Sequence, residues 1–461
     1  MKVPKYVAIT EKTDQLEPKT PTDPNYKVMP ILGLAGEIGS LLAELKKRVR
    51  EPTRIKRVSK RRLKEELGDI LWYAVTVARR AGLDFQQDVM FENLKRIQDN
   101  PGIYLPLLDD DDSPGKALRN AIEKDGKRTV ENFESYRENA MKSAKFGKDK
   151  KALLPYLVKI WKNSGDLLVK LDLQTANFTA KEKPIVAQAL GDIMWYVAGF
   201  TTLYNLNLNG IAKDNTKKTL SMFRPKDERK RTPLYDTDFP LLEQFPRIFD
   251  VIFTPAPWDS EQAIMIVNGL RVGDPLRDNA YKRKKGKKKT KKGEYTIQDN
   301  RLIEIDGYRF HDSVHFAFIA ILGWSPVMRG LMKRKRKTKG DVDDADDGAR
   351  AQIVEEMIVK LTHSYAVGID EDKLLDDEEQ VSFDLLKQIK VLADGLEVTG
   401  GRKGTQSLKY WEWEKAILAG FHVYNDLRRW RKGRLHVNMT ERTIELFELK
   451  EGEENFFPGA G

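Results

Sequence analysis

Residues 65–73 read EELGDILWY, and this stretch decides the fold of the N-terminal part of the chain. Its apolar residues recur at the spacing of one helix face, while Glu66 and Asp69, three residues apart, project together beside that face. Burying carboxylates without a compensating cation is costly. The stretch therefore predicts a core-facing helix whose two acids need a metal ion or a basic side chain nearby.

A second acidic helix is expected just upstream, over about residues 31–49, where Glu37 and Glu44 share one face two turns apart. If this helix runs antiparallel to the first, Glu37 joins Glu66 and Asp69 in a ligand set made only of oxygen atoms. Such a set suits Mg²⁺ or Mn²⁺ and not zinc. The alternative is a solvated charged face with ordinary salt bridges, because Glu-rich helices are common.

The composition is that of a globular protein in a reducing compartment. The chain has 461 residues, 40% of them hydrophobic, which is enough for several domains with buried cores. It has no cysteine, which excludes disulfides and thiolate sites and predicts a cytoplasmic location. The net charge of +11 favours polyanionic partners, either nucleotides or nucleic acid. No signal peptide and no apolar run of about 20 residues stands out, so no membrane partner is expected.

The central motif occurs twice. Residues 190–196 read LGDIMWY and repeat residues 67–73, LGDILWY, with one change. Asn215 aligns with Asn93 if a gap of one residue is allowed. Repeated segments of this length generally mark one structural unit used twice. The sequence therefore predicts two copies of one helical bundle.

The second copy has lost part of the acidic set. Asn163 stands where the first copy has Glu37, and Ala189 stands where it has Glu66, although Asp192 remains. Asp166 of the second copy aligns with Ser40 of the first. One interpretation is duplication followed by decay, in which the second copy only packs against the first. The other is that the second copy lends groups to the site of the first.

The segment GLAGEIG at 33–39, followed by EELGDILWY, resembles the MazG family of all-α nucleoside triphosphate pyrophosphohydrolases. That family places Glu-x-x-Glu on one helix and Glu-x-x-Asp on the next. The resemblance implies that Glu37, Glu66 and Asp69 are catalytic and bind Mg²⁺, with Mn²⁺ as the other candidate ion. The chain departs from the pattern at Ser40, where the second Glu is missing. Glu44, one turn further on, is an additional candidate ligand.

The resemblance also implies a reaction and an assembly. A later Asn and basic residues belong to the family pattern, which makes Asn93, Lys95 and Arg96 candidate nucleotide-binding residues. The substrate would be a nucleoside triphosphate, hydrolysed to the monophosphate and pyrophosphate in nucleotide-pool control or phage defence. Because such proteins work as dimers or tetramers, the two copies are expected to form an internal pseudo-dimer, with further homo-oligomers. The alternative is a catalytically weakened nucleotide-binding or assembly module whose C-terminal domain is the effector.

The C-terminal part mixes short strands with helices. Residues 250–253 and 263–267 are predicted strands with a hairpin turn at Asn268-Gly269, 273–280 a loop, and 437–449 a strand-and-helix tail. The segments GDPL at 273–276 and FHDSVHFAF at 310–318 resemble the C-terminal domain appended to some MazG-like proteins. The Lys-rich insert at 282–292 is foreign to that pattern, and a solvated loop is favoured over a nucleic-acid patch because it has no interleaved aromatics.

A second polar cluster is expected in this part. His311 and His315 lie four residues apart on one predicted helix, with Asp312 between them and Glu355 and Glu356 on a later helix. The spacing is similar to that of a zinc site. Asp312 replaces the Glu of His-Glu-x-x-His, which argues against protease chemistry. The alternative is a polar seam of hydrogen-bonded histidines.

The predicted fold class is mainly α. Two MazG-type four-helix bundles, at 1–108 and 116–223, are followed by a mostly helical C-terminal domain with a few short β-strands at 236–450.

Overall fold

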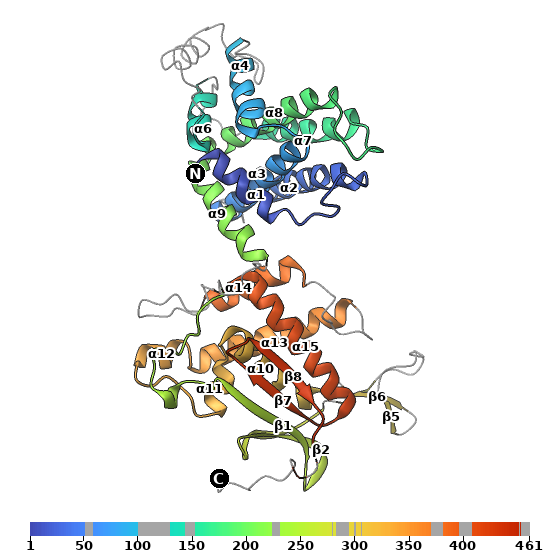
Figure 1. Ribbon diagram of the computed structural model, residues 1–461, viewed down its shortest axis with the longest axis vertical. Coiled ribbons are helices and arrows are strands. Elements are labelled where there is room, and N and C mark those ends of the chain that lie inside the picture. Colours follow the sequence, from blue (N-terminus) through green and yellow to red (C-terminus); the bar gives the residue numbers. More distant parts are fainter. Residues whose placement is uncertain are drawn as a thin grey trace. The chain divides into compact units, whose positions relative to one another are not determined.

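The structure, a computed structural model, is mainly helical, as predicted, and its named strands all lie in the C-terminal part (Figure 1). It divides into two compact units, Met1–Leu220 and Ser221–Gly461. The first unit holds the predicted first bundle and ends three residues before the predicted end of the second, at residue 223. The structure describes residues 1–50, 59–99, 130–142, 153–223, 231–278, 280–282, 295–298, 301–305, 307–369, 381–395, 408–450 and 452.

The first unit is built from two similar sets of helices. In each set a long acidic-motif helix packs along the helix before it, as α3 does with α2 and α8 with α7. The first set comprises α1 (Val3–Thr13), α2 (Asn25–Arg50), α3 (Lys60–Arg80), the π-helical η1 (Phe85–Phe91) and α4 (Glu92–Asp99). The second comprises α6 (Phe133–Met141), α7 (Leu153–Lys170), α8 (Glu182–Leu203) and α9 (Leu208–Met222).

Local sequence explains the central helix α3. Ser59 caps its first turn by accepting a hydrogen bond from the backbone of Arg62, and Gly82, with φ of 69°, follows its end. Leu67 and Ile70 are buried in the core as their spacing predicted. A side chain at Gly33 of α2 would collide with the ring of Tyr73, so this glycine lets α2 and α3 approach closely.

The two sets share one apolar core. α2 contacts α7, and α3 contacts α8, so residues of both repeats belong to the same cluster. A buried ion pair also joins them: Lys27 Nζ of α2 lies 2.6 Å from Glu182 Oε1 at the start of α8. The first unit is therefore one body made of two interlocked repeats.

One helix passes a simple test for a membrane span. Over Asn25–Lys47, α2 has the length and the mean hydropathy, 1.5, of a helix that could cross a bilayer, although no such run stood out in the sequence. In this fold Leu34, Ile38 and Leu41 of that stretch are buried against the other helices of the first unit. Core helices of globular proteins commonly pass the same test.

The second unit is organised around a five-stranded antiparallel sheet of order β3-β2-β1-β7-β8, and α10 and α15 pack together and against β7 and β8 (Figure 1). The strands are β1 (Ile248–Ala256), β2 (Asp259–Val267), β3 (Leu270–Arg277), β7 (Gly433–Asn438) and β8 (Thr443–Phe447), with β4 (Ala280–Lys282), β6 (Arg301–Ile305) and β5 (Tyr295–Gln298) forming a small second sheet. The helices are η4 (Leu241–Glu243), η5 (Tyr308–Phe310), α10 (Asp312–Leu322), α11 (Pro326–Leu331), α12 (Gly340–Ala345), α13 (Ala349–Ile369), α14 (Phe383–Asp394) and α15 (Tyr410–Trp430).

The hairpin at Asn268-Gly269 is confirmed, with φ of 51° and 77°, and it joins β2 to β3.

Two local predictions are wrong. The expected loop at 273–280 begins inside β3, an edge strand that tolerates Pro275. The tail contains no helix over 437–449. Instead, β7, whose residues are alternately buried and partly exposed, pairs antiparallel with β8 to form a hairpin. Apart from Lys282, the insert at 282–292 lies outside the described residues.

Candidate nucleotide site between the two repeats

The carboxylate helices α2 and α3 bring Glu37 and Asp69 to the same side chain, Tyr73. Burial raises the pKa of Tyr73, and the negative charges of Glu37 and Asp69 raise it further, to about 12. Glu66 lies one turn before Asp69 on α3 and is half-buried. Glu37 and Asp69 therefore act on one region of the α2–α3 pair, and Glu66 lies one turn away from Asp69 on α3.

Asp69 is held by residues of the second repeat. The Nδ2 of Asn215, on α9, donates a hydrogen bond to Asp69 Oδ1 over 2.9 Å. Lys218, one turn further along α9, places its Nζ 2.5 Å from Asp69 Oδ2 and 3.5 Å from Glu65 Oε1. The buried hydroxyl of Tyr6 donates to Asn215 Oδ1 over 2.7 Å and so fixes the orientation of that amide.

The same arrangement occurs in reverse at the second repeat. Asp192 of α8 lies 3.0 Å from the guanidinium of Arg96, on α4 of the first repeat. Asn93, one turn before Arg96, accepts a hydrogen bond from the Tyr136 hydroxyl over 2.8 Å. Each repeat thus presents an Asn and a basic residue, three positions apart, to the acidic helix of the other.

A glycine before each aspartate allows this exchange. A Cβ added at Gly68 would lie 3.0 Å from the Cβ of Asn215, and one at Gly191 would lie 3.0 Å from the Cβ of Asn93. Both contacts are tighter than a side chain normally tolerates. The Leu-Gly-Asp sequence that marks the repeat is therefore explained by the close approach of the opposite repeat's helix.

These contacts place the predicted nucleotide-binding residues beside the second repeat. Asn93 and Arg96 meet Gly191 and Asp192, and Lys95 forms an exposed pair with Glu92 at 3.0 Å. Their role in nucleotide binding stays a prediction. Asn215 and Lys218 were not predicted from the sequence as neighbours of Asp69. The alignment of Asn215 with the candidate residue Asn93 was the sequence feature that indicated such a role for Asn215.

Glu44, the additional candidate ligand, is engaged elsewhere. Its Oε2 lies 2.7 Å from Lys47 Nζ and 3.3 Å from Arg62 Nη1. Burial alone would raise the pKa of Glu44, but these two basic partners outweigh it and lower the pKa. Ser40, between Glu37 and Glu44 on α2, is exposed. The position of the missing family Glu is therefore open to solvent.

The corresponding region of the second repeat has few acids. Asp166 lies 2.7 Å from Lys162 and 3.3 Å from Lys170, in an exposed i,i+4 network along α7. Ala189 and Asn163 carry no charge at the positions of Glu66 and Glu37. Within the first unit, the full predicted set of acids is found on the first repeat.

The polar cluster of the second unit is the tightest gathering of metal-binding side chains. Candidate ligand atoms of His311, His315 and Glu356 lie within 4.8 Å of one another, and no other group of three is found among the residues that the structure describes. Glu37, Glu66 and Asp69 are thus not drawn together to that distance. Like charges repel, and Asp69 is held by Asn215 and Lys218.

One comparison with known proteins gives a match. Residues 285–450 match the family model of the MazG C-terminal domain. This match confirms the predicted MazG-associated C-terminal domain over those residues and indicates a link with MazG proteins. It leaves the first unit, with both repeats, uncovered. No curated protein and no solved structure gives a significant match to the chain.

Proposed function

We propose that the first unit is a nucleoside triphosphate pyrophosphohydrolase with one composite site. The reaction would split the bond between the α- and β-phosphates and release a monophosphate and pyrophosphate. The observation that carries the proposal is the contact of Asn215 and Lys218 with Asp69, because it adds a cationic side chain and an amide from one repeat to the acids of the other. Acids and cations around one position are what a metal–triphosphate complex requires.

The acids fit a hard divalent cation. Glu37, Glu66 and Asp69 offer only carboxylate oxygens, and such ligands suit Mg²⁺ or Mn²⁺. When bound, the ion would neutralise phosphate charge and supply an acidified water for attack at the α-phosphorus. The three acids would hold it, without the help of Ser40, which is neutral.

Lys218 would change partners when substrate enters. In the free protein its ammonium group balances the charge of Asp69 at 2.5 Å. A cation bound at Asp69 would repel that ammonium group, which could then contact a phosphate oxygen as a point charge. Asn215 would keep Asp69 in place throughout, because Tyr6 orients its amide from the buried side.

The duplicated chain would then contain a single working site. The second repeat keeps Asp192 but has Ala189 and Asn163 in place of two acids, so it lacks the ligands for a cation. Its contribution would be the helix α9, which carries Asn215 and Lys218. The internal pseudo-dimer of the family-based expectation is in this proposal a functional pair, and further homo-oligomers stay a prediction.

A second candidate is a nucleotide-binding or assembly module without turnover, with the C-terminal domain as its effector. Two observations favour it: Glu44 is engaged by Lys47 and Arg62, and Lys218 sits at Asp69 where a cation would bind. Pyrophosphate release from a panel of ribo- and deoxyribonucleoside triphosphates, with Mg²⁺ or Mn²⁺, separates the two candidates. We expect multiple turnovers on at least one substrate. Metal-dependent nucleotide binding with no pyrophosphate released would favour the second candidate instead.

A further inference from the structure

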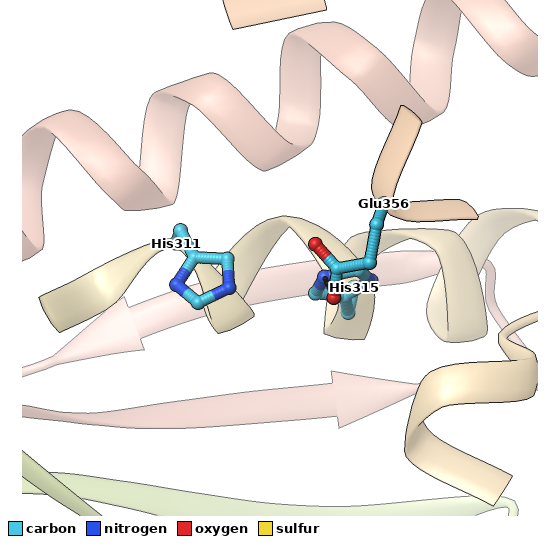
Figure 2. Close-up of side chains that lie close together, drawn as sticks. All are labelled: His311, His315 and Glu356. Carbon is cyan, nitrogen blue, oxygen red and sulfur yellow. Dashed lines mark ion pairs between the residues drawn. The ribbon is translucent and has the colours of Figure 1, made fainter. Parts of the chain in front are cut away.

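We propose that His311, His315 and Glu356 form a binding site for a divalent transition metal in the second unit, independent of the nucleotide site. His311 is the N-cap residue of α10, His315 lies one turn along the same helix, and Glu356 comes from α13. Figure 2 shows Glu356 reaching across to His315, with the ring of His311 one turn away. The site would connect α10 to α13.

The ring of His311 is fixed in the orientation that a metal ligand needs. Its Nδ1 lies 2.8 Å from the carbonyl oxygen of Tyr308, and a carbonyl can only accept, so Nδ1 carries the proton of the neutral ring. The lone pair is then on Nε2. The Tyr308 ring stacks on the imidazole, with centroids 4.2 Å apart and planes 9° apart, which holds the ring in this position.

The ring of His315 is fixed in the same way. Its Nδ1 lies 2.7 Å from Oε1 of Glu355, a fully buried carboxylate whose other oxygen accepts from the backbone of Val327 over 2.8 Å. A carboxylate that binds Nδ1 directs the other nitrogen toward a metal and raises its basicity. The two neighbouring glutamates of α13 thus have different roles, Glu355 holding the imidazole and Glu356 facing its Nε2.

The surroundings of the His315 Nε2 atom point to a ligand. The side chain is fully buried, and this nitrogen has no hydrogen bond of good geometry among the described residues, only ion pairs with carboxylates. Glu356 Oε1 lies 3.4 Å from it, and Asp312 Oδ1 lies 4.0 Å from it and 3.5 Å from Nε2 of His311. Contacts of this length satisfy a buried nitrogen only weakly, and a weakly satisfied buried polar group costs stability. One cation between these atoms would satisfy both imidazoles and the carboxylates together.

The ligand types select the class of metal. Two imidazole nitrogens with one or two carboxylate oxygens suit Zn²⁺, Co²⁺, Fe²⁺ or Mn²⁺, whereas Mg²⁺ and Ca²⁺ prefer oxygen alone. Glu356 is half exposed, at 48% of its side-chain surface, so the metal would be reached from solvent on that side. The competing arrangement is an imidazolium of His315 in ion pairs with Glu355 and Glu356, with no metal.

Cobalt gives a direct test, because its visible absorption reports nitrogen and oxygen ligands in a low-symmetry site. The full chain is stripped with a chelator and titrated with Co²⁺ in excess Mg²⁺, which keeps the carboxylates of the first unit occupied. We expect one Co²⁺ per chain with intense visible bands, which Zn²⁺ then removes. His311→Ala and Glu356→Gln change side chains that are 13% and 48% exposed, and each should weaken Co²⁺ binding at least about tenfold.

Two controls separate this site from others. His422→Ala removes an exposed helical histidine that lies 3.7 Å from Asp426, and it should leave the bands unchanged. Asp69→Asn should also leave them unchanged, so failure of the nucleotide proposal would not affect this result. A folded wild-type chain without cobalt bands, or bands that persist at wild-type affinity in both His311→Ala and Glu356→Gln, would show that the cluster is an ion-pair network.

Discussion

Asn215 of the second repeat donates a hydrogen bond to Asp69 of the first repeat over 2.9 Å, and its own carbonyl oxygen accepts from Tyr6 of the first repeat over 2.7 Å. The amide is therefore held at both ends by the opposite repeat. The ion pair of Lys218 with Asp69 has its counterpart in the ion pair of Arg96 with Asp192, at 3.0 Å. If the site is active, the duplication is part of its chemistry and not only of its packing.

Lys218→Ala should reduce turnover more than its symmetry counterpart, Arg96→Ala. The ammonium of Lys218 lies at the acids of the first repeat, where we place the triphosphate, so its loss should lower kcat/KM by roughly a hundredfold, about 2.7 kcal/mol. Arg96 faces Asp192, beside the decayed acids, and its removal should cost no more than a few-fold. Steady-state pyrophosphate release gives kcat/KM for both variants and shows which loss is larger. Equal losses would instead support the nucleotide-binding role predicted for Arg96.

Ser40→Glu should tighten Mg²⁺ binding. The substitution restores the carboxylate of the family pattern at an exposed position of α2, and one more negative charge adds to the local attraction for the ion. Lys46→Gln makes the same change in net charge on the face of α2 opposite Glu37, where Lys46 is exposed, and serves as the control. Calorimetric Mg²⁺ titrations of the three proteins provide the comparison. An unchanged or weaker affinity in Ser40→Glu alone would argue against a metal site there.

Lys27→Met should destabilise the first unit strongly. The Lys27 ammonium is fully buried and lies 2.6 Å from Glu182 Oε1, so the variant leaves a buried carboxylate without its counter-charge. Such losses cost about 3 to 5 kcal/mol. Lys162→Met breaks an exposed pair with Asp166 and should cost less than about 1 kcal/mol. Urea unfolding measured for both variants tests whether Lys27 joins the repeats; similar small losses would exclude that role.

The same pair predicts how stability depends on acid. Burial by itself raises the pKa of Glu182, but hydrogen bonds from Lys27, Thr179 and the Asp172 backbone outweigh it and lower the pKa to about 2. A carboxyl whose folded pKa lies below its unfolded value stabilises the fold above the unfolded pKa. This contribution should be complete above about pH 5 and disappear as the pH falls toward 2.

Glu182→Gln isolates that contribution from the other carboxylates. The difference in unfolding free energy between wild type and variant should shrink as the pH is lowered from 6 to 3. Denaturant unfolding of both proteins across this interval provides the measurement. A difference that stays constant, or grows in acid, would mean that the Lys27–Glu182 pair does not lower the pKa of Glu182 in the folded protein.

The acidic helices and the repeat could be predicted from sequence because helical periodicity is local. The residues that contact these acidic helices could not be predicted. Asn93 lies close to Glu66 and Asp69 in the sequence, yet the structure places Asn215 at Asp69 instead, because the two repeats exchange helices across their interface. Periodicity tells which face of a helix is polar, but not which repeat that face meets. Gly68 and Gly191 permit the close approach, but a glycine in a helix does not identify the residue that approaches it.

In the second unit, the spacing of His311 and His315 predicted that both imidazoles lie on one helix face. The different roles of Glu355 and Glu356 depend on how α13 packs against α10, which no local pattern gives. The β3 and β7–β8 errors have a similar origin. Pro275 reads as a loop residue, but it is accommodated because β3 is at the sheet edge, a position defined only by the tertiary fold.

The central claim is that one composite site of the first repeat does the chemistry, and Asp69→Asn beside Asp192→Asn tests it most directly. The two aspartates occupy equivalent positions in the repeats and make equivalent contacts with the opposite repeat. Pyrophosphate release should fall at least about a hundredfold in Asp69→Asn and stay within about threefold of wild type in Asp192→Asn, with the far-UV helical signal of both retained. Wild-type turnover in Asp69→Asn, or equal losses in the two variants, would contradict the account.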